Sequence, residues 1–485
     1  MEPKSAAPVR GTRDFGASQM RRRKALFSVI EAAFLRCGYG PLETPAMESG
    51  STLSGKYGEE GDRLIFHVLN SGSFSEGIDP DQWNQLREQP RRLVPLLCEK
   101  ALRYDLTVPL ARYVAANHAK LSFPFKRYQI QPVWRADRPQ KGRFREFIQC
   151  DADVVAPEIS TFHQAELLGL YRDVLDGLGF RNYRIRVNDR RFLNLLASWG
   201  GVPGQVARLG LLLDKLDKQG WAVVRDELLA LGFEPTKLDR LVQSVPLDRP
   251  MGQVMTWIEF HDWMQAILGD GGMTDLVRED ALNALKETEQ VVTFFGQNQA
   301  DGSSASGGDS LTFDPCLARG IDYYTGLVVE VVAPELGLGS LGGGGMYSGL
   351  TALFGYPEWK GMGISFGAER LLEGMDRLGL WDESSLRGMD ILCYASDPSL
   401  DPAAQSWVLT WRSQGFSADW FPISGKYKKA TEHAQRSEVA WMVVFGEREW
   451  AAGEVTLQST DQKHRHRLPP SEVAAFLQAS TNPLA

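Results

Sequence analysis

The pattern of apolar residues changes twice along the chain, and this limits the fold more than any other feature of the sequence. Between about residues 190 and 300, successive segments repeat apolar residues with a helical period, as in QVARLGLLLDKLDKQG and DALNALKETEQVVTFFG. Strand-like segments lie on both sides of this block: YQIQPVWR (128–135) and FREFIQCDADVV (144–155) before it, and GLVVEVVAP (326–334) after it. The sequence therefore predicts an α+β protein in which a block of helices is inserted into a sheet domain.

The chain has 485 residues, which is too long for one compact core. Beyond residue 387, strand-like segments such as MDILCYAS and VAWMVVFG alternate with helical ones, which indicates a small α/β domain. We expect four segments: a first part of the sheet domain (1–190), the helical insertion (191–305), a second part of the sheet domain (306–386) and the C-terminal α/β domain (387–485).

Composition excludes several classes of protein. The formal net charge of −8 disfavours nonspecific coating of nucleic acid, although it leaves room for local basic patches. The five cysteines are scattered, so we expect neither a disulfide framework nor a zinc site, and a reducing cytoplasm is the expected location. Neither a membrane span nor a secretory signal is expected.

A cationic stretch, RADRPQKGRFREF (135–147), joins two predicted strands. Arg135 ends the first strand, and Arg143 begins the second with Arg145. Guanidinium groups fit phosphate oxygens, so a rigid strand pair carrying them could bind a polyphosphate and stabilise the charge of nucleotidyl transfer. Phe144 or Phe147 could stack on a base. A solvated basic hairpin is the alternative, because charge runs commonly have no other role.

Two further segments combine glycine with polar residues. The segment LARGIDYYTGLVVEVV (317–332) places an Arg, an acid and two phenols before an apolar strand, which suits a polar pocket or a decorated turn. The glycines of GGGG (342–345) and GMGISFGAER (361–370) do not form a P-loop, but with Arg370 they could flank a flat ligand. Asp105 and Asp153 are either acids that bind an ammonium group or surface acids.

Together these stretches resemble class II aminoacyl-tRNA synthetases, and specifically the histidyl-tRNA synthetase family. Residues 11–48 resemble the entry and motif 1, VWRADRPQKGRFREF resembles motif 2, and GMGISFGAERLL resembles motif 3. LARGIDYYTG is similar to the signature peptide that is peculiar to the histidine enzymes. The resemblance covers nearly the whole chain.

The resemblance implies a class II catalytic core, namely a six-stranded antiparallel sheet flanked by helices, with a helical insertion and a C-terminal α/β anticodon-binding domain. It implies histidine–tRNA ligase activity, in which L-histidine and ATP form histidyl-adenylate and the histidyl group passes to the 3′ end of tRNA(His). ATP would carry Mg²⁺, with no permanently bound cofactor and no metal held by the protein. The implied assembly is a cytoplasmic homodimer formed through motif 1, without membrane contact.

The resemblance also implies roles for residues that match the family motifs. On the ATP side these are Arg135 and Arg319 as cations at the α-phosphate, Asp137 near the adenine amino group, Phe147 stacked on adenine, and Arg143 and Arg370 at the β- and γ-phosphates. On the histidine side, Asp105 and Gln149 hold the α-amino end, Asp153 and Tyr324 contact the two imidazole nitrogens, and Tyr323 belongs to the same site. Arg138 and Gln140 meet the tRNA acceptor end.

One departure from the family pattern concerns the usual GGGRYD, which here reads GGGMYS (343–348). Met346 replaces an Arg and Ser348 an Asp, and their joint loss leaves no unpaired charge, so we expect activity to be retained. The alternative function is a non-catalytic paralogue, either a regulatory subunit of histidine biosynthesis or a sensor of uncharged tRNA. Retention of the arginines assigned to ATP favours the enzyme.

Overall fold

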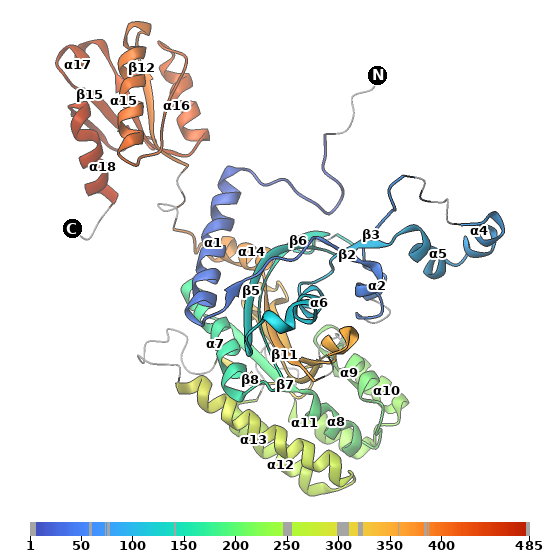
Figure 1. Ribbon diagram of the computed structural model, residues 1–485. Coiled ribbons are helices and arrows are strands. Elements are labelled where there is room, and N and C mark those ends of the chain that lie inside the picture. The colour runs from blue at the N-terminus through green and yellow to red at the C-terminus, as the bar shows by residue number, and fades with distance from the viewer. Residues whose placement is uncertain are drawn as a thin grey trace. The chain divides into compact units, whose positions relative to one another are not determined.

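The computed structural model describes residues 6–57, 61–72, 74, 78–139, 142–245, 255–297, 310–318, 324–356, 358–382, 386 and 388–481. It separates into two compact units, which are described one at a time (Figure 1). The first comprises Met1–Asp14 and Leu26–Leu380, and the second comprises Phe15–Ala25 and Trp381–Ala485.

An eight-stranded sheet forms the centre of the first unit. In spatial order its strands are β1 (Gly40–Pro41), β5 (Phe125–Trp134), β6 (Glu146–Ala156), β11 (Lys360–Gly367), β10 (Ser340–Ser348), β9 (Tyr324–Val332), β7 (Arg184–Asp189) and β8 (Leu311–Phe313). The six strands from β5 to β7 are antiparallel to their neighbours, whereas β1 and β8 pair in parallel at the two edges. The predicted six-stranded antiparallel sheet is therefore confirmed, and it gains one short parallel strand at each edge.

The two faces of this sheet differ because side chains alternate along each strand. In β6, Cys150, Ala152 and Val154 point to one face, and the polar residues between them point to the other. Helix α7 (Thr161–Gly177) and the part of α1 (Ala17–Arg36) that belongs to this unit, from Leu26 onward, cover the apolar face. There the rings of Phe34 and Tyr171 lie 6.1 and 4.8 Å from that of Phe366. We call the opposite side, defined by Gln149, Asp151 and Asp153 of β6, the polar face.

Helix α6 (Thr107–Asn117) closes one end of the polar face (Figure 1). Its Leu110 and Val114 pack with Val155 of β6 in one apolar cluster. Before α6 lies a small three-stranded sheet, β2 (Met47–Ser49), β4 (Lys100–Leu102) and β3 (His67–Val68), with α2 (Gly50–Leu53), α4 (Pro80–Leu86) and α5 (Pro90–Leu97) in the connections. The turn from β4 into α6 carries Asp105 to the polar face.

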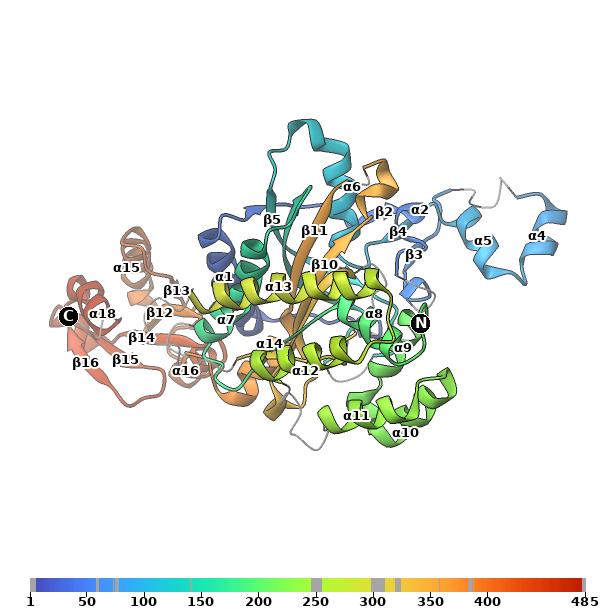
Figure 2. The same cartoon turned by 90° about the horizontal axis from the view of Figure 1, so that it is seen from below.

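The predicted helical insertion is present between β7 and β8. Its helices are α8 (Arg190–Trp199), α9 (Val206–Leu213), α10 (Leu216–Leu231), α11 (Pro235–Ser244), α12 (Trp257–Asp270) and α13 (Asp275–Gln297). Figure 2 shows α12 and α13 side by side. Arg191 at the start of α8 pairs with Asp189 and with Glu287 of α13, which joins the insertion to the end of β7. Helix α14 (Ala368–Leu378) then follows β11.

The second unit contains an α/β domain, as the alternation of strands and helices predicts. Its sheet has the order β13 (Ala418–Trp420), β12 (Met389–Ala395), β14 (Val439–Phe445), β15 (Val455–Ser459) and β16 (Arg465–Leu468), with helices α15 (Asp401–Ser413), α16 (Tyr427–Arg436), α17 (Glu447–Ala451) and α18 (Val473–Thr481). The core gathers around the buried Trp411. No helix in the described ranges is long and apolar enough to cross a membrane.

Candidate active site

Strand register sets the order of side chains on the polar face. Residues directly opposite each other in adjacent strands point to the same side of a sheet. One row therefore runs from Arg127 of β5 through Asp153 of β6 to Gly363 of β11. The next row runs from Gln129 through Asp151 to Ser365, and Gln149 lies in the row beyond it. Neighbouring polar groups within a row therefore lie on adjacent strands, and neighbouring rows are two residues apart along each strand.

Asp153 is held by two donors. Arg127 forms an ion pair with its Oδ2 at 2.8 Å, and the Tyr347 hydroxyl donates to its Oδ1 at 2.9 Å. All three side chains are buried. Burial raises the pKa of Asp153, and the positive charge of Arg127 opposes that rise. The carboxylate is therefore a fixed negative group with a defined orientation.

Two opposed glycines bring Asp153 next to Tyr324. Gly345 of β10 and Gly363 of β11 face each other in the register. A Cβ on Gly363 would lie 2.0 Å from Asp153 Oδ1, and one on Gly345 would lie 2.7 Å from the Tyr324 ring. The carboxylate and the ring therefore occupy the space that two side chains would otherwise fill. Asp153 and Tyr324, which are the residues predicted to bind the imidazole ring, therefore lie over two neighbouring glycines of β11 and β10.

Asp105 reaches the same face from the turn before α6. It accepts hydrogen bonds from the Tyr57 hydroxyl at 3.0 Å and from the Val108 amide at 3.2 Å. Burial raises its pKa, while the Val108 amide and the charge of Arg135 lower it. The charges of Asp105 also act on Asp151 and Asp153. Asp105, Asp151 and Asp153 therefore form one cluster of buried carboxyl groups.

The motif 2 stretch links this group to the predicted nucleotide residues. The Arg135 Nε donates to the Tyr104 carbonyl at 3.0 Å, and its guanidinium lies 4.2 Å from the Tyr104 ring and 5.3 Å from the Phe147 ring. Arg143 lies 3.6 Å from Asp137. The guanidinium of Arg13 stacks 3.3 Å from Phe144, so of the two phenylalanines considered for base stacking, Phe147 is the one beside Arg135.

The remaining predicted site residues fall into two groups. Arg370 lies in the first turn of α14 and donates to the Ser340 carbonyl, and Arg138 is exposed in the turn after Arg135. Arg319, Tyr323 and Gln140 lie outside the described residues.

Some polar-face residues were not predicted from the sequence, namely Arg127, Gln129, Asp151, Tyr347 and Tyr57. The alternation of polar and apolar residues in QCDADVV was a usable signal for Asp151, because it places this residue on the same face as Asp153. The partners of Asp153 come from two other strands, so their identification depends on register and needs the tertiary structure.

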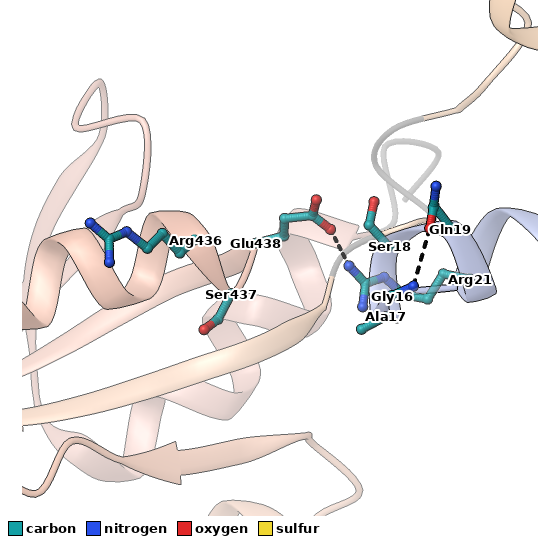
Figure 3. A pocket seen from close by; sticks show the side chains of 8 residues that line it. All are labelled: Gly16, Ala17, Ser18, Gln19, Arg21, Arg436, Ser437 and Glu438. Atoms are coloured by element: carbon teal, nitrogen blue, oxygen red, sulfur yellow. Dashed lines mark hydrogen bonds and ion pairs between the residues drawn. The ribbon is translucent and has the colours of Figure 1, made fainter. Parts of the chain in front are cut away.

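One pocket lies in the second unit (Figure 3). Its lining is Gly16, Ala17, Ser18, Gln19, Arg21, Arg436, Ser437 and Glu438. Arg21 forms an ion pair with Glu438, and the Gly16 amide donates to the Gln19 side chain at 3.1 Å. None of the predicted site residues contributes to it.

Comparison with known proteins places the chain in a family. A family model described as histidyl-tRNA synthetase matches residues 98–371, and a model described as anticodon binding domain matches residues 391–480. A histidine–tRNA ligase from Cytophaga hutchinsonii is 38% identical over 464 residues, which cover 96% of this chain and 97% of the relative. The chain belongs to the histidyl-tRNA synthetase family.

Solved members and relatives of the family share the fold. A histidyl-tRNA synthetase from Nostoc superimposes with a TM-score of 0.77 at 22% identity, over 99% of this chain and all of that one. A Bacillus halodurans protein described as an ATP phosphoribosyltransferase regulatory subunit/histidyl-tRNA synthetase gives 0.66 at 17% identity, over 92% and 99%. At these identities the likeness concerns the fold alone.

The structure shows the surroundings of Met346 and Ser348, the two residues that depart from the usual family pattern. A Cβ on Gly326 of β9 would lie 2.9 Å from the Met346 sulfur, so the thioether covers this glycine on the neighbouring strand. Ser348, the last residue of β10, lies opposite Lys360, the first residue of β11, in the strand register. Neither replacement adds a buried charge to the site, and retained activity remains a prediction.

Proposed function

We propose that this chain is a histidine–tRNA ligase. L-histidine and ATP react to give histidyl-adenylate and pyrophosphate, and the histidyl group then passes to the 3′ end of tRNA(His). The observation that carries the proposal is the group of buried acids on the polar face beside Arg135, in a chain related over its full length to proteins of that name. Such a group suits an amino acid that bears an ammonium group and a nitrogen-rich ring.

The proposed histidine site uses the polar face. Asp105 and Gln149 hold the α-ammonium end, and Asp153 and Tyr324 contact the ring nitrogens, with Tyr323 in the same site. Hydrogen-bonding groups that are buried and fixed reject amino acids without matching groups, because the protein groups would then remain unpaired. The buried Gln149 donates to Ser365 at 2.9 Å, which leaves its amide oxygen for the substrate.

In the proposed first step, a carboxylate oxygen of histidine attacks the α-phosphorus in line. The new C–O–P bond forms as the bond to the pyrophosphate oxygen breaks, and pyrophosphate leaves with that electron pair. Arg135 and Arg319 stabilise the charge on the α-phosphate, because preorganised guanidinium groups remain cationic throughout. Asp137 and Phe147 would hold adenine, and Arg143 and Arg370 the β- and γ-phosphates.

We assign no protein ligand to Mg²⁺, which would enter as part of the ATP substrate. Within the described part of the chain, no group of three or more His, Cys, Asp or Glu side chains is placed to hold a metal ion. When bound with ATP, the ion would neutralise phosphate charge, and the arginines of this chain would orient the nucleotide around it.

The wider assembly is also part of the proposal. Residues 387–485 would bind the anticodon, 191–305 would form the insertion, and 1–190 with 306–386 would form the catalytic core. Arg138 and Gln140 would meet the acceptor end of the tRNA. A cytoplasmic homodimer would form through motif 1.

Histidine-dependent exchange of pyrophosphate into ATP tests the proposal directly. The purified chain with Mg²⁺ should catalyse exchange, and Arg135→Ala should lower its rate at least 100-fold, about the effect of losing a preorganised transition-state cation. Arg87→Ala is the matched control, because Arg87 is an exposed residue of the segment between β3 and β4. Folded protein without exchange would contradict the proposal and favour the non-catalytic paralogue.

A further inference from the structure

Arg145 of motif 2 has contacts that the proposed function does not use. Its Nη1 donates to the Arg10 carbonyl at 3.4 Å, and its amide donates to the Gly11 carbonyl at 2.8 Å. Its own carbonyl accepts a hydrogen bond from the Arg135 amide at 3.0 Å. The N-terminal segment (9–13) therefore pairs with motif 2 directly beside the arginine assigned to the α-phosphate.

Gly11 allows the N-terminal segment to approach this closely. Its φ of +91° lies in the left-handed region that side chains rarely adopt. A Cβ at this position would also lie 2.8 Å from Arg145 Cγ and 3.0 Å from Pro139 Cγ. The segment is thus held against motif 2 by its backbone as well as by the Arg145 side chain.

Arg13, at the end of this segment, contacts motif 2 and motif 3 at the same time. Its guanidinium lies 3.3 Å from the centre of the Phe144 ring and forms an ion pair with Glu369. Glu369 lies in the first turn of α14, with 7% of its side chain exposed. A guanidinium can make both contacts because its flat face stacks on an aromatic ring while its edge donates to a carboxylate.

The two residues that Arg13 contacts are sequence neighbours of the arginines assigned to the β- and γ-phosphates. Phe144 follows Arg143, and Glu369 precedes Arg370. A polyphosphate held from two elements requires a fixed separation between them, because a misplacement of about 1 Å can lower a rate about 100-fold. Arg13 therefore lies where it can set this separation.

The pairing of β6 with β11 ends before these residues. Its last pair is Gln149 with Gly367, and the chain then enters α14 at Ala368. Strand register fixes the distance between the two motifs only as far as this pair. Beyond it, contacts between side chains must align the motifs, and Arg13 supplies one that reaches both.

We propose that Arg13 is a positioning residue for ATP, which holds motifs 2 and 3 at the separation that lets Arg143 and Arg370 bind the β- and γ-phosphates together. It acts through Phe144 and Glu369 and not by contact with the nucleotide. This inference rests on the proposed function and deepens it, because it gives the N-terminal segment a part in nucleotide binding.

AMP and ATP together test this role, because AMP has no β- and γ-phosphates. Isothermal titration calorimetry with Mg²⁺ and without histidine measures the dissociation constants of both nucleotides, and pyrophosphate exchange measures KM for ATP and for histidine. Arg13→Ala should raise both constants for ATP about tenfold, which is the effect of losing one hydrogen bond between charged groups. The dissociation constant of AMP and KM for histidine should each stay within about twofold of wild type.

Arg10→Ala is the matched control, because it removes the same charge from the same segment. The Arg10 side chain is exposed, and the contact with Arg145 uses the Arg10 backbone carbonyl, which the substitution keeps. Its dissociation constant for ATP should stay within about twofold of wild type, which excludes a general effect of lost positive charge. Arg13→Lys keeps the charge without the planar group, so it should weaken ATP binding about threefold, and it replaces Arg13→Ala if that variant does not fold.

Glu369→Gln tests the coupling from the other side of the ion pair. It should weaken ATP binding and leave AMP binding unchanged. The double variant with Arg13→Ala should bind ATP no more weakly than the weaker single variant, because two changes that break one interaction do not add. Tighter ATP binding by Glu369→Gln would mean that Arg13 contacts the phosphates itself, and additive effects would mean independent roles. Either result would overturn the inference.

Two further results would overturn it. Equal loss of ATP and AMP binding in Arg13→Ala would mean that this residue only supports the structure of motif 2. Unchanged ATP binding would mean that other contacts align the two motifs. Failure of the wild-type chain to catalyse exchange is a separate result, since it contradicts the proposed function, whereas the inference is judged from nucleotide binding alone. A wild-type chain that binds no ATP would contradict both.

Discussion

Replacement of Asp151 by Asn should make the ligand-free protein more stable at neutral and alkaline pH. In the unfolded chain this carboxyl group ionises near its ordinary pKa of 3.8, whereas burial raises its pKa in the folded chain to about 7. The folded state therefore retains a proton that the unfolded state has lost. The contribution of Asp151 to stability is fully present below pH 3.8, declines as the pH rises, and is lost above about pH 7.

The magnitude follows from the pKa difference. One pKa unit corresponds to about 1.4 kcal/mol, so the rise to about 7 amounts to roughly 4 kcal/mol of stability lost by pH 8. Asn has nearly the same shape and no charge to desolvate. The variant should exceed wild type by up to about 4 kcal/mol at pH 8, and the difference should shrink toward zero near pH 4.

Urea unfolding at several pH values between 5 and 8, without histidine or ATP, measures this difference. Glu88→Gln serves as the control, because this acid is largely exposed and its replacement should leave the pH dependence unchanged. A stability difference that does not vary with pH, or a variant less stable than wild type at pH 8, would refute the reasoning. An unfavourable buried acid that persists in an enzyme is consistent with a role in substrate recognition.

Three further predictions concern the partners of Asp153. Arg127→Ala leaves a buried carboxylate without its cation and should lower the free energy of unfolding by about 3–5 kcal/mol in urea titration, whereas unchanged stability would contradict the buried pair. Tyr347→Phe removes the 2.9 Å hydrogen bond to Asp153 and should lower the free energy of unfolding by about 1–3 kcal/mol in the same assay. Unchanged stability would contradict this hydrogen bond. Gly363→Ala places a Cβ 2.0 Å from Asp153 Oδ1, so it should displace the carboxylate and raise KM for histidine well above wild type while KM for ATP is retained; an equal rise in both constants would contradict a local effect.

Much of the architecture could be predicted from local patterns. The helical insertion, the strands on either side of the motif 2 turn and the alternating C-terminal domain all follow from apolar periodicity, which reflects which side of each element faces a core. The short edge strands β1, β8 and β16 were harder to predict. Each has two to four residues and pairs along only one side, so its sequence carries little periodic signal.

The sequence by itself determined the family motifs and the candidate site residues that they predict, because motifs such as RADRPQKGRFREF and RGIDYYTG depend on residue type and spacing along the chain. Only the tertiary structure decided how these residues are paired. Strand register opposes Arg127 to Asp153 and Gly345 to Gly363, although more than 15 residues separate the members of each pair along the chain. Tyr347 reaches Asp153 from β10, and Asp151 is left with an unpaired oxygen. A one-residue shift in register would turn each of these side chains to the opposite face, which is why local sequence alone does not determine the site.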